Sequence, residues 1–321
     1  MNIPHYRYDL GQGMYVDCFS IDPEIGTHQL EEMLREKDGT GVDPKTLAPN
    51  FKEYGSFQSF NDLKIRFSTD SYMVPSGFDE HRDAIGEHFD NQFKIVDGKK
   101  VNKYKNGPVG LVDGEVSVPL ELFRGGYYDF KATELSCVPS DFSDNYPHGK
   151  TIEDFFNENG LNHTHRARYL GITYLLTTDS GENISTIHRQ KGLLVAPDCI
   201  ATPGSTPPYD IKFSEPDFDF HRFYSDHIAQ EMHEEFKLSP NEFEIKGIRL
   251  LDEPRFIPYF AVEVNTKLPS TRVVKRIHGN KDAISEHPIA YFANRPSTQE
   301  FINRFPVFPG CQFALHRFLS D

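Results

Sequence analysis

The sequence contains no tryptophan and only four cysteines among its 321 residues. Cys18, Cys137, Cys199 and Cys311 are far apart and form no CxxC pair, which argues against a zinc knuckle or a redox motif. We therefore expect each of them to be a buried free thiol. No stretch approaches the roughly 18 apolar residues of a membrane-spanning helix. The first residues also lack a charged segment followed by an apolar one, so we expect a cytoplasmic protein with no membrane partner.

Positive charge is scarce as well, since 48 acidic residues against 34 basic ones give a formal net charge of -14. The mean electrostatic field repels phosphate backbones, which argues against nucleic-acid polymers as partners. A small anionic substrate is compatible with this charge, because a divalent metal held by carboxylates inverts the local sign. With 37% hydrophobic residues and 27 phenylalanines, the composition predicts a folded protein with a Phe-rich core. The length is sufficient for two domains.

The first half of the chain has the pattern of short strands joined by turns. In HQLEEMLREK, the side chains of Leu30, Met33 and Leu34 recur at i, i+3 and i+4, which predicts a surface helix. Further along, runs such as DLKIRFS and GYYDFKATEL are separated by Gly, Pro, Asn and Asp, as is typical of β-hairpins. We assign residues 1–160 to a β-rich N-terminal domain of unknown role. It either closes over a site in the second half or forms a homodimer surface.

The second half alternates longer strands with helices. The stretch YLGITYLLTTDSGENISTIHRQ predicts a hairpin with a tight central turn. A helix is predicted from Ser225 to Lys237, with Ser225 as its N-cap and Ile228, Met232 and Phe236 as its apolar stripe. FEIKGIRLL and FIPYFAVEVNT predict two strands after it, and STQEFINRF predicts a helix near the end.

The predicted helix carries three carboxylates on one face. Glu231, Glu234 and Glu235 stand at i, i+3 and i+4, away from the apolar stripe. Like charges at this spacing repel one another, at a cost of a few tenths of a kcal/mol per pair. Carboxylates that converge in this way suit hard cations such as Mg²⁺, which take oxygen ligands and bridge to substrate phosphates. The alternative is a solvated acidic face, which would be the better interpretation of an isolated EMHEE.

The same run resembles the Nudix box, G-x5-E-x7-R-E-U-x-E-E-x-G-U, where U is apolar. The last nine positions of the box align without gaps on residues 230–238, and the matching residues are Glu231, Met232, Glu234, Glu235 and Leu238. The order of the preceding hairpin and the following strands is also similar to the family, over roughly residues 166 to 321. The resemblance implies an α+β protein in which residues 161–321 form a Nudix-type α/β/α sandwich, preceded by the β-rich N-terminal domain.

Several box positions depart from the family pattern. Gln230 stands in place of Arg, and Lys237 in place of Gly. Counted strictly backwards, the box Gly falls on Pro216 and the first Glu on Arg222; if the preceding loop is longer than usual, Gly204 is the box Gly and no residue clearly replaces the first Glu. In the family the box Arg is understood to brace the catalytic Glu by a salt bridge. Gln230 can donate a hydrogen bond but supplies no charge.

The resemblance implies hydrolysis of a nucleoside diphosphate linked to another moiety. Mg²⁺ or Mn²⁺ held by Glu231, Glu234 and Glu235 would neutralise the diphosphate and lower the pKa of an attacking water. A carboxylate that does not hold the metal would accept the proton, and Glu235 and Glu231 are both candidates. No substrate-binding residue can be assigned from the sequence.

Two other functions stay open. The altered box favours a degenerate Nudix module that binds a nucleotide or a protein partner, although the three retained carboxylates oppose it. A Nudix-fold enzyme with altered chemistry, such as cleavage of the N-glycosidic bond of a nucleotide, would also be expected to have an altered box.

The aromatic and histidine residues give weaker signals. The aromatic side chains before and within the helix could stack on a base, but at this density we interpret them as packing of the loop against its own domain; they are Phe213, Phe218, Phe220 and Tyr224. His163 and His165 could bind a metal, but we interpret them as part of a polar linker turn. The histidines of the tail are interpreted as ordinary surface or core residues; they are His278, His287 and His316.

Overall fold

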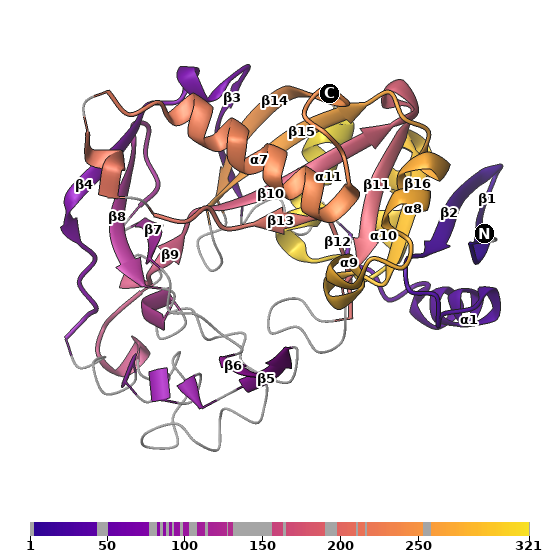
Figure 1. Ribbon diagram of the computed structural model, residues 1–321, viewed down its shortest axis with the longest axis horizontal. Coiled ribbons are helices and arrows are strands. Elements are labelled where there is room, and N and C mark those ends of the chain that lie inside the picture. The colour runs from indigo at the N-terminus through magenta and orange to yellow at the C-terminus, as the bar shows by residue number, and fades with distance from the viewer. Residues whose placement is uncertain are drawn as a thin grey trace.

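The structure is a computed structural model (Figure 1). It describes residues 3–43, 51–76, 82–83, 86–87, 90–91, 93–96, 99–102, 108–112, 115–126, 128–130, 156–162, 165–189, 198–209, 211–215, 217–252 and 258–320. Within these ranges no helix is long and apolar enough to cross a membrane. Cys18 and Cys311 are buried thiols, as expected, whereas Cys199 is half-buried and Cys137 lies outside the described residues.

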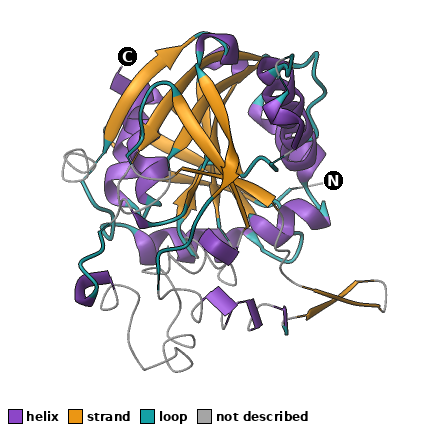
Figure 2. Cartoon of the chain, turned by 90° about the vertical axis from the view of Figure 1, so that its left-hand side faces the viewer, coloured by secondary structure: helices purple, strands orange, loops and turns teal. Residues whose placement is uncertain are grey.

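One ten-stranded sheet forms the centre of the molecule, as Figure 2 shows. Its strands are β1 (His5–Gly11), β2 (Met14–Ser20), β3 (Lys52–Phe57), β10 (Gly171–Thr178), β11 (Asn183–His188), β12 (Ile200–Ala201), β13 (Gly204–Ser205), β14 (Phe243–Asp252), β15 (Tyr259–Thr266) and β16 (Ile289–Asn294). The order is β1-β2-β16-β11-β10-β15-β14-β3, with β12 beside β11 and β13 beside β10. Strands β10 and β15 are parallel, and the other pairs are antiparallel. The predicted hairpin is confirmed as β10 and β11, and the two predicted later strands as β14 and β15.

Helices cover both faces of this sheet. On one face lie α7 (Phe220–Phe236), α8 (Ser270–Ile277) and α9 (Lys281–Glu286), and on the other lie α1 (Thr27–Lys37), α10 (Arg295–Arg304) and α11 (Pro309–Ser320). Alternate side chains of each strand enter the two cores. In β15, for example, Phe260 and Val262 pack under α7, whereas Tyr259 and Ala261 pack under α10 and α11. The layers are therefore α/β/α, and the predicted helices at α1 and α10 are confirmed.

Smaller elements make up the rest of the described chain. A four-stranded sheet has the order β4-β8-β7-β9 and a two-stranded one pairs β5 with β6; the strands are β4 (Ile65–Ser71), β5 (Phe93–Val96), β6 (Lys99–Asn102), β7 (Pro108–Val112), β8 (Leu120–Gly126) and β9 (Arg168–Tyr169). Short 3₁₀ helices are η2 (Phe60–Asp62), η6 (Asp179–Gly181) and η7 (Ile211–Ser214). The strand predicted in GYYDFKATEL is wrong at residues 128–130, which are helical. The side chain of Asp129 accepts a hydrogen bond from the backbone of Gly126 (2.7 Å), which turns the chain at the end of β8.

The central sheet takes strands from both sides of the boundary that we expected near residue 160. Strand β2 extends it beyond β16, where Ser20 pairs with Ile289, and β3 extends it beyond β14, where Phe57 pairs with Ile248. Conversely, β9 from the second half joins the four-stranded sheet through β7. The sheets therefore do not separate at residue 160, because strand pairing joins segments that are distant in sequence. The division into 1–160 and 161–321 stays a prediction.

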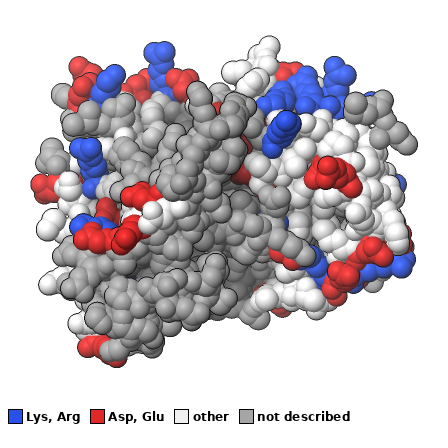
Figure 3. Space-filling model, turned by 60° about the horizontal axis from the view of Figure 1, so that its bottom comes forward, with Lys and Arg blue, Asp and Glu red and all other residues white. Residues whose placement is uncertain are grey.

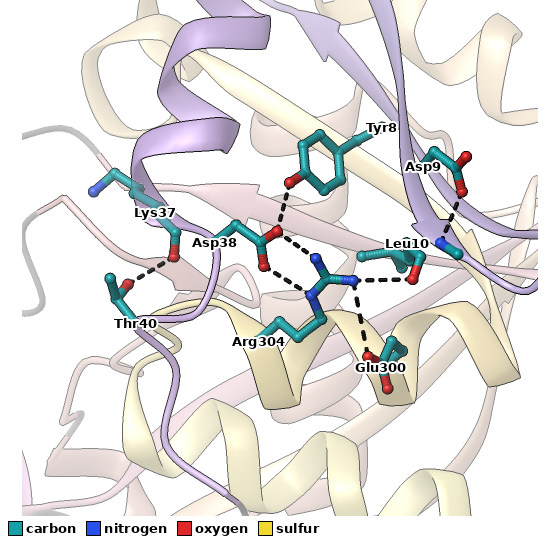
Figure 4. Close-up of polar contacts among 9 residues, drawn as sticks. Tyr8, Asp9, Leu10, Lys37, Asp38, Thr40, Glu300 and Arg304 are labelled. Atoms are coloured by element: carbon teal, nitrogen blue, oxygen red, sulfur yellow. Dashed lines mark hydrogen bonds and ion pairs between the residues drawn. The ribbon is translucent and has the colours of Figure 1, made fainter.

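An ion pair fastens the N-terminal segment to helix α10 (Figure 4). Nε of Arg304 donates to Oδ1 of Asp38 at 2.7 Å, and its Nη2 contacts the second carboxylate oxygen. The hydroxyl of Tyr8 donates to Asp38 at 2.6 Å, and Nη1 of Arg304 donates to the carbonyl oxygen of Leu10 at 2.9 Å. The Arg304 guanidinium holds the pKa of the Asp38 carboxyl below its usual value. The contacts join α1, β1 and α10.

We predict that Asp38→Asn lowers the free energy of unfolding by about 1 kcal/mol at pH 7, a modest loss because both side chains are partly exposed. Since the pKa of Asp38 is lowered in the folded protein, its stabilisation is present above the unfolded-state pKa and disappears as the pH falls through the folded-state pKa. Denaturant unfolding at several pH values should therefore show that wild type and variant differ less in their free energy of unfolding as the pH falls. Glu300→Gln is the control, because its carboxylate is 3.9 Å from Arg304. An equal loss in that control would contradict the prediction.

A fragment that begins at residue 161 should not fold by itself. It would lack β2 and β3, so the edges of β16 and β14 would be unpaired, and such edges promote aggregation. It would also lack Val16 and Phe60, which are fully buried in the two cores. Far-UV circular dichroism and thermal unfolding of the purified fragment check this. A soluble fragment with cooperative unfolding would instead establish residues 161–321 as an independent domain.

Candidate functional site

Helix α7 lies across the central sheet and begins earlier than the sequence predicted (Figure 1). Its N-cap is Asp219 rather than Ser225, because the carboxylate of Asp219 accepts a hydrogen bond from the backbone N–H of Arg222 at 2.9 Å. Phe236 is the last helical residue, and Lys237 after it takes a left-handed conformation with φ of 54°. The buried stripe is Tyr224, Ile228, Met232 and Phe236. It extends the predicted stripe by one turn and sets the rotation of the helix.

Glu231 and Glu235 lie one turn apart on α7, each next to a residue of the buried stripe. Their side chains are only 17% and 14% exposed, although they stand beside the apolar stripe rather than in it. Burial raises the pKa of the Glu231 carboxyl to about 7, with a further contribution from the charges of Glu234 and Glu286. Burial also raises the pKa of Glu235 to about 8, and Glu286 and Glu231 add to this. Carboxyl groups perturbed by burial and by neighbouring charge are candidates for a functional site.

Glu234, the third predicted metal ligand, is exposed to solvent. Its Oε1 accepts a hydrogen bond from Nε2 of Gln230 at 2.8 Å, one turn earlier on the helix. Among the described residues, no three His, Cys, Asp or Glu side chains gather closely enough to hold a metal ion. The role of Glu234 as a ligand stays a prediction, and it requires another side-chain conformation in which the carboxylates come together.

A chain of hydrogen bonds approaches Glu231 from the sheet. The hydroxyl of Tyr174 on β10 is 2.5 Å from Oγ of Ser205 on β13, which is 2.9 Å from Nε2 of His227. The same Nε2 atom is 3.8 Å from Oε1 of Glu231. Burial lowers the pKa of His227 and raises that of Tyr174. Because Ser205 and Glu231 face one nitrogen, this is not a nucleophile–base–acid triad, in which the acid holds the other nitrogen.

The position before Ser205 requires glycine. Gly204 pairs with Thr173 of β10, and a Cβ atom at Gly204 would lie 2.8 Å from the carbonyl oxygen of Ile172. Real Cβ atoms do not approach a backbone oxygen so closely. The assignment of Gly204 as the box Gly stays a prediction, and Pro216 lies outside the described residues.

We predict that Gly204→Ala lowers the free energy of unfolding by about 1–3 kcal/mol, because β13 must move away from β10. Gly247→Ala is the matched control within the same sheet. Its Cβ would lie 3.7 Å from the Glu263 side chain, which is ordinary contact. Denaturant unfolding of both variants measures the difference. Equal stability of the two would show that β13 can shift without cost.

His287, which lies between α9 and β16, faces the side chain of Glu235. Nδ1 of His287 lies 3.1 Å from Oε2 of Glu235. The two atoms are close but not aligned, so neither has a hydrogen-bond partner among the described residues. Burial, together with the charge of Arg189, lowers the pKa of His287 to about 4. From the sequence, His287 is interpreted as an ordinary surface or core histidine, because a single His in ISEHPIAYFA has no spacing signal that links it to the helix.

Arg189 brings a positive charge to the same place. His188 pairs with Ile289, so Arg189 lies opposite the residue next to His287. Its charge lowers the pKa of both Glu235 and His287, and its buried Nε has no hydrogen-bond partner within the described part of the chain. Sequence reasoning missed Arg189 as well, because strand pairing alone brings it near the helix.

The aromatic side chains before α7 pack against the protein, as the sequence analysis interpreted them. Phe213 is buried, and its ring centroid lies 4.6 Å from those of Phe67 and Phe223. The ring of Tyr224 stacks on Phe60 at 4.8 Å. These contacts tie the loop and α7 to the N-terminal half and leave the rings of Phe213 and Tyr224 little surface for a base.

Other candidate sites lie elsewhere. A pocket of about 510 Å³ lies in the N-terminal half and includes neither Glu231 nor Glu235. Its lining residues are Arg82, Asp83, Gly86, Glu87, Asp90, Asn91 and Tyr128. His163 lies outside the described residues, and Nδ1 of His165 is 3.0 Å from Oδ1 of Asn162 in a local turn. On the face shown in Figure 3, the acidic and basic side chains of the described residues are interspersed. The perturbed carboxyl groups on α7 are therefore the stronger candidate.

Comparison with known proteins adds little to this geometry. No family model matches the chain, and no curated protein matches it. Among solved structures, the chain is similar to the MutT protein from Methanosarcina mazei Go1, with 14% sequence identity and a TM-score of 0.29. The match covers 46% of this chain and 91% of that one. A TM-score this low carries no argument, so the relation to the Nudix family stays a resemblance that rests on the box residues.

Proposed function

We propose that this protein is a divalent-metal-dependent pyrophosphohydrolase that acts on a nucleoside diphosphate linked to another moiety. The observation that carries the proposal is the pair of half-buried carboxyl groups, Glu231 and Glu235, each with a raised pKa. A structure that only needed a solvated helix face would have no reason to bury two mutually repelling acids. Their positions are also those at which the Nudix box has glutamates.

The residues present are compatible with Mg²⁺ or Mn²⁺. Mg²⁺ commonly keeps several waters and is held by one or two carboxylates and by substrate phosphates, rather than by a complete protein cage. Glu231 and Glu235 offer two carboxylates, and the buried Oε2 of Glu235 has no hydrogen-bond partner among the described residues. Burial raises both pKa values and like-charge repulsion adds to it; a cation beside the two acids would offset this repulsion. Glu234 would be a third ligand after a change of its side-chain conformation.

The acids and Arg189 would have separate roles in the hydrolysis of the diphosphate. When bound, the divalent ion would supply charge neutralisation of the diphosphate and activation of water. Water attacks one phosphorus, the bridging P–O bond breaks, and a nucleoside monophosphate and the phosphorylated remainder leave. Glu235 or Glu231, whichever does not hold the ion, accepts the proton of the water. Arg189 is the nearby cation that can offset the negative charge around Glu235.

The test is an assay with Mg²⁺ or Mn²⁺ and a panel of ADP-ribose, dinucleoside polyphosphates, nucleotide sugars and NAD, with products resolved by mass. We predict release of a nucleoside monophosphate, and a loss of turnover of at least about 100-fold in Glu235→Gln. Asp226→Asn, an exposed change on the same helix, should retain activity. Both variants should keep the wild-type melting temperature within a few degrees.

Unchanged turnover in Glu235→Gln would contradict the proposed site. Release of a free base would identify N-glycosidic bond cleavage, the altered chemistry considered from the sequence, in place of pyrophosphate hydrolysis.

A second candidate function is a binding module without catalysis. The observation that favours it is the hydrogen bond from Gln230 to the exposed Glu234, because Gln230 supplies no charge to brace a catalytic glutamate. Such a module would raise its melting temperature with a nucleotide ligand or a protein partner but leave the nucleotide intact. The assay above separates the two functions.

A further inference from the structure

His287 has features that set it apart from a core histidine. It is 0% exposed, yet both ring nitrogens lack a hydrogen-bond partner among the described residues. Most buried polar atoms have such a partner, and the exceptions need an explanation. Facing the ring is Oε2 of Glu235, which is itself buried and has no hydrogen-bond partner among the described residues. Two unsatisfied buried groups therefore face each other at 3.1 Å in the candidate site.

The histidine is held more firmly than the glutamate. Its backbone N–H donates to the carbonyl oxygen of Ala283 at 2.8 Å, which closes the end of α9. Two residues later Ile289 begins β16 and pairs with both His188 and Ser20, on either side of the strand. The ring lies 6.4 Å from that of Phe236. The side chain of Glu235, in contrast, extends from the last turn of α7 through more rotatable bonds than that of a histidine. A contact between the two therefore constrains the glutamate rather than the histidine.

We propose that His287 is a positioning residue, which holds Oε2 of Glu235 through Nδ1 and leaves the second carboxyl oxygen for the metal or the attacking water. The proposal rests on the proposed function. The interaction is available in either form of the acid, since Nδ1 accepts from a carboxylic acid and donates to a carboxylate. Catalytic hydrogen bonds are often poorly aligned without ligand and tighten in the complex, which accounts for the misalignment at 3.1 Å.

Two substitutions of His287 distinguish its two ring nitrogens. Asn places its amide where the histidine has Nδ1, whereas Gln reaches the position of Nε2. His287→Asn should therefore retain the contact with Glu235, and His287→Gln should lose it. His233→Gln is the control, because His233 is exposed on the same helix. Groups that orient a metal-binding residue typically contribute 10- to 100-fold in metal affinity or activity.

The experiment measures Mn²⁺ affinity by electron paramagnetic resonance, and kcat and KM on the substrate found above, for all three variants. We expect His287→Gln to weaken Mn²⁺ binding or lower kcat by about 10- to 100-fold with KM within about threefold, and His287→Asn and the control to stay near wild type. In a Glu235→Gln background, His287→Gln should have little further effect, because His287 acts through Glu235. Equal losses in both His287 variants, or a full loss in the Glu235→Gln background, would overturn the proposal.

Failure of the proposed function would be visible separately. If wild type neither binds Mn²⁺ nor hydrolyses any nucleotide, the function is wrong, and the positioning contact is then measured directly by the ¹³Cδ chemical shift of Glu235 in protein labelled at glutamate. His287→Gln should move that signal and His287→Asn should leave it near its wild-type position. A signal unmoved by His287→Gln would overturn the positioning role. A melting temperature within a few degrees of wild type shows that each variant is folded.

Discussion

The candidate site depends on the burial of the apolar stripe of α7 against the central sheet. Tyr224, Ile228, Met232 and Phe236 are almost completely buried, and burial of one such side chain contributes on the order of 1.5–3 kcal/mol. The stripe therefore fixes the rotation of the helix. The residues beside it, Glu231 and Glu235, have to lie at the margin of the core whatever their charge. Their perturbed pKa values follow from this packing.

Polar groups from several elements lie near the two acids. Glu231 is approached by His227, which is held by Ser205, and Glu235 by His287, with Arg189 nearby. Gln230 takes no part in this arrangement, since its amide is bonded to Glu234 on the solvent side. If the protein is a hydrolase, the support of the catalytic glutamates comes from other elements of the fold, and an altered box is compatible with activity.

The N-terminal and C-terminal parts of the chain form a common structure. Besides the pairing of β2 with β16, a partly buried series of polar contacts crosses between them: Nζ of Lys37 is 3.0 Å from Oδ1 of Asp198, which is 3.0 Å from Nε2 of His188. Nδ1 of His188 is in turn 3.1 Å from the hydroxyl of Tyr291. This series lies on the side of the sheet opposite α7. It joins α1 to β11 and β16, the two strands next to Arg189 and His287.

The sequence by itself determined the elements whose signals are local. The periodicity of Leu30 and Leu34 was sufficient for α1, an apolar run followed by a tight turn for β10 and β11, and the spacing of Glu231 and Glu235 for a shared helix face. The N-cap was wrong because Asp219 and Ser225 are both capping residues, and packing of Tyr224 on Phe60 extends the helix to the earlier one.

Only the tertiary structure decided which of these elements meet. The pairing of β2 with β16, the position of His287 beside Glu235 and the approach of Arg189 join residues far apart in the chain. Periodicity describes which side of an element is apolar but not which element covers it. Burial and hydrogen bonding between distant segments therefore set the pKa values of the acids, and this is why the sequence could locate the carboxylates but not the groups that surround them.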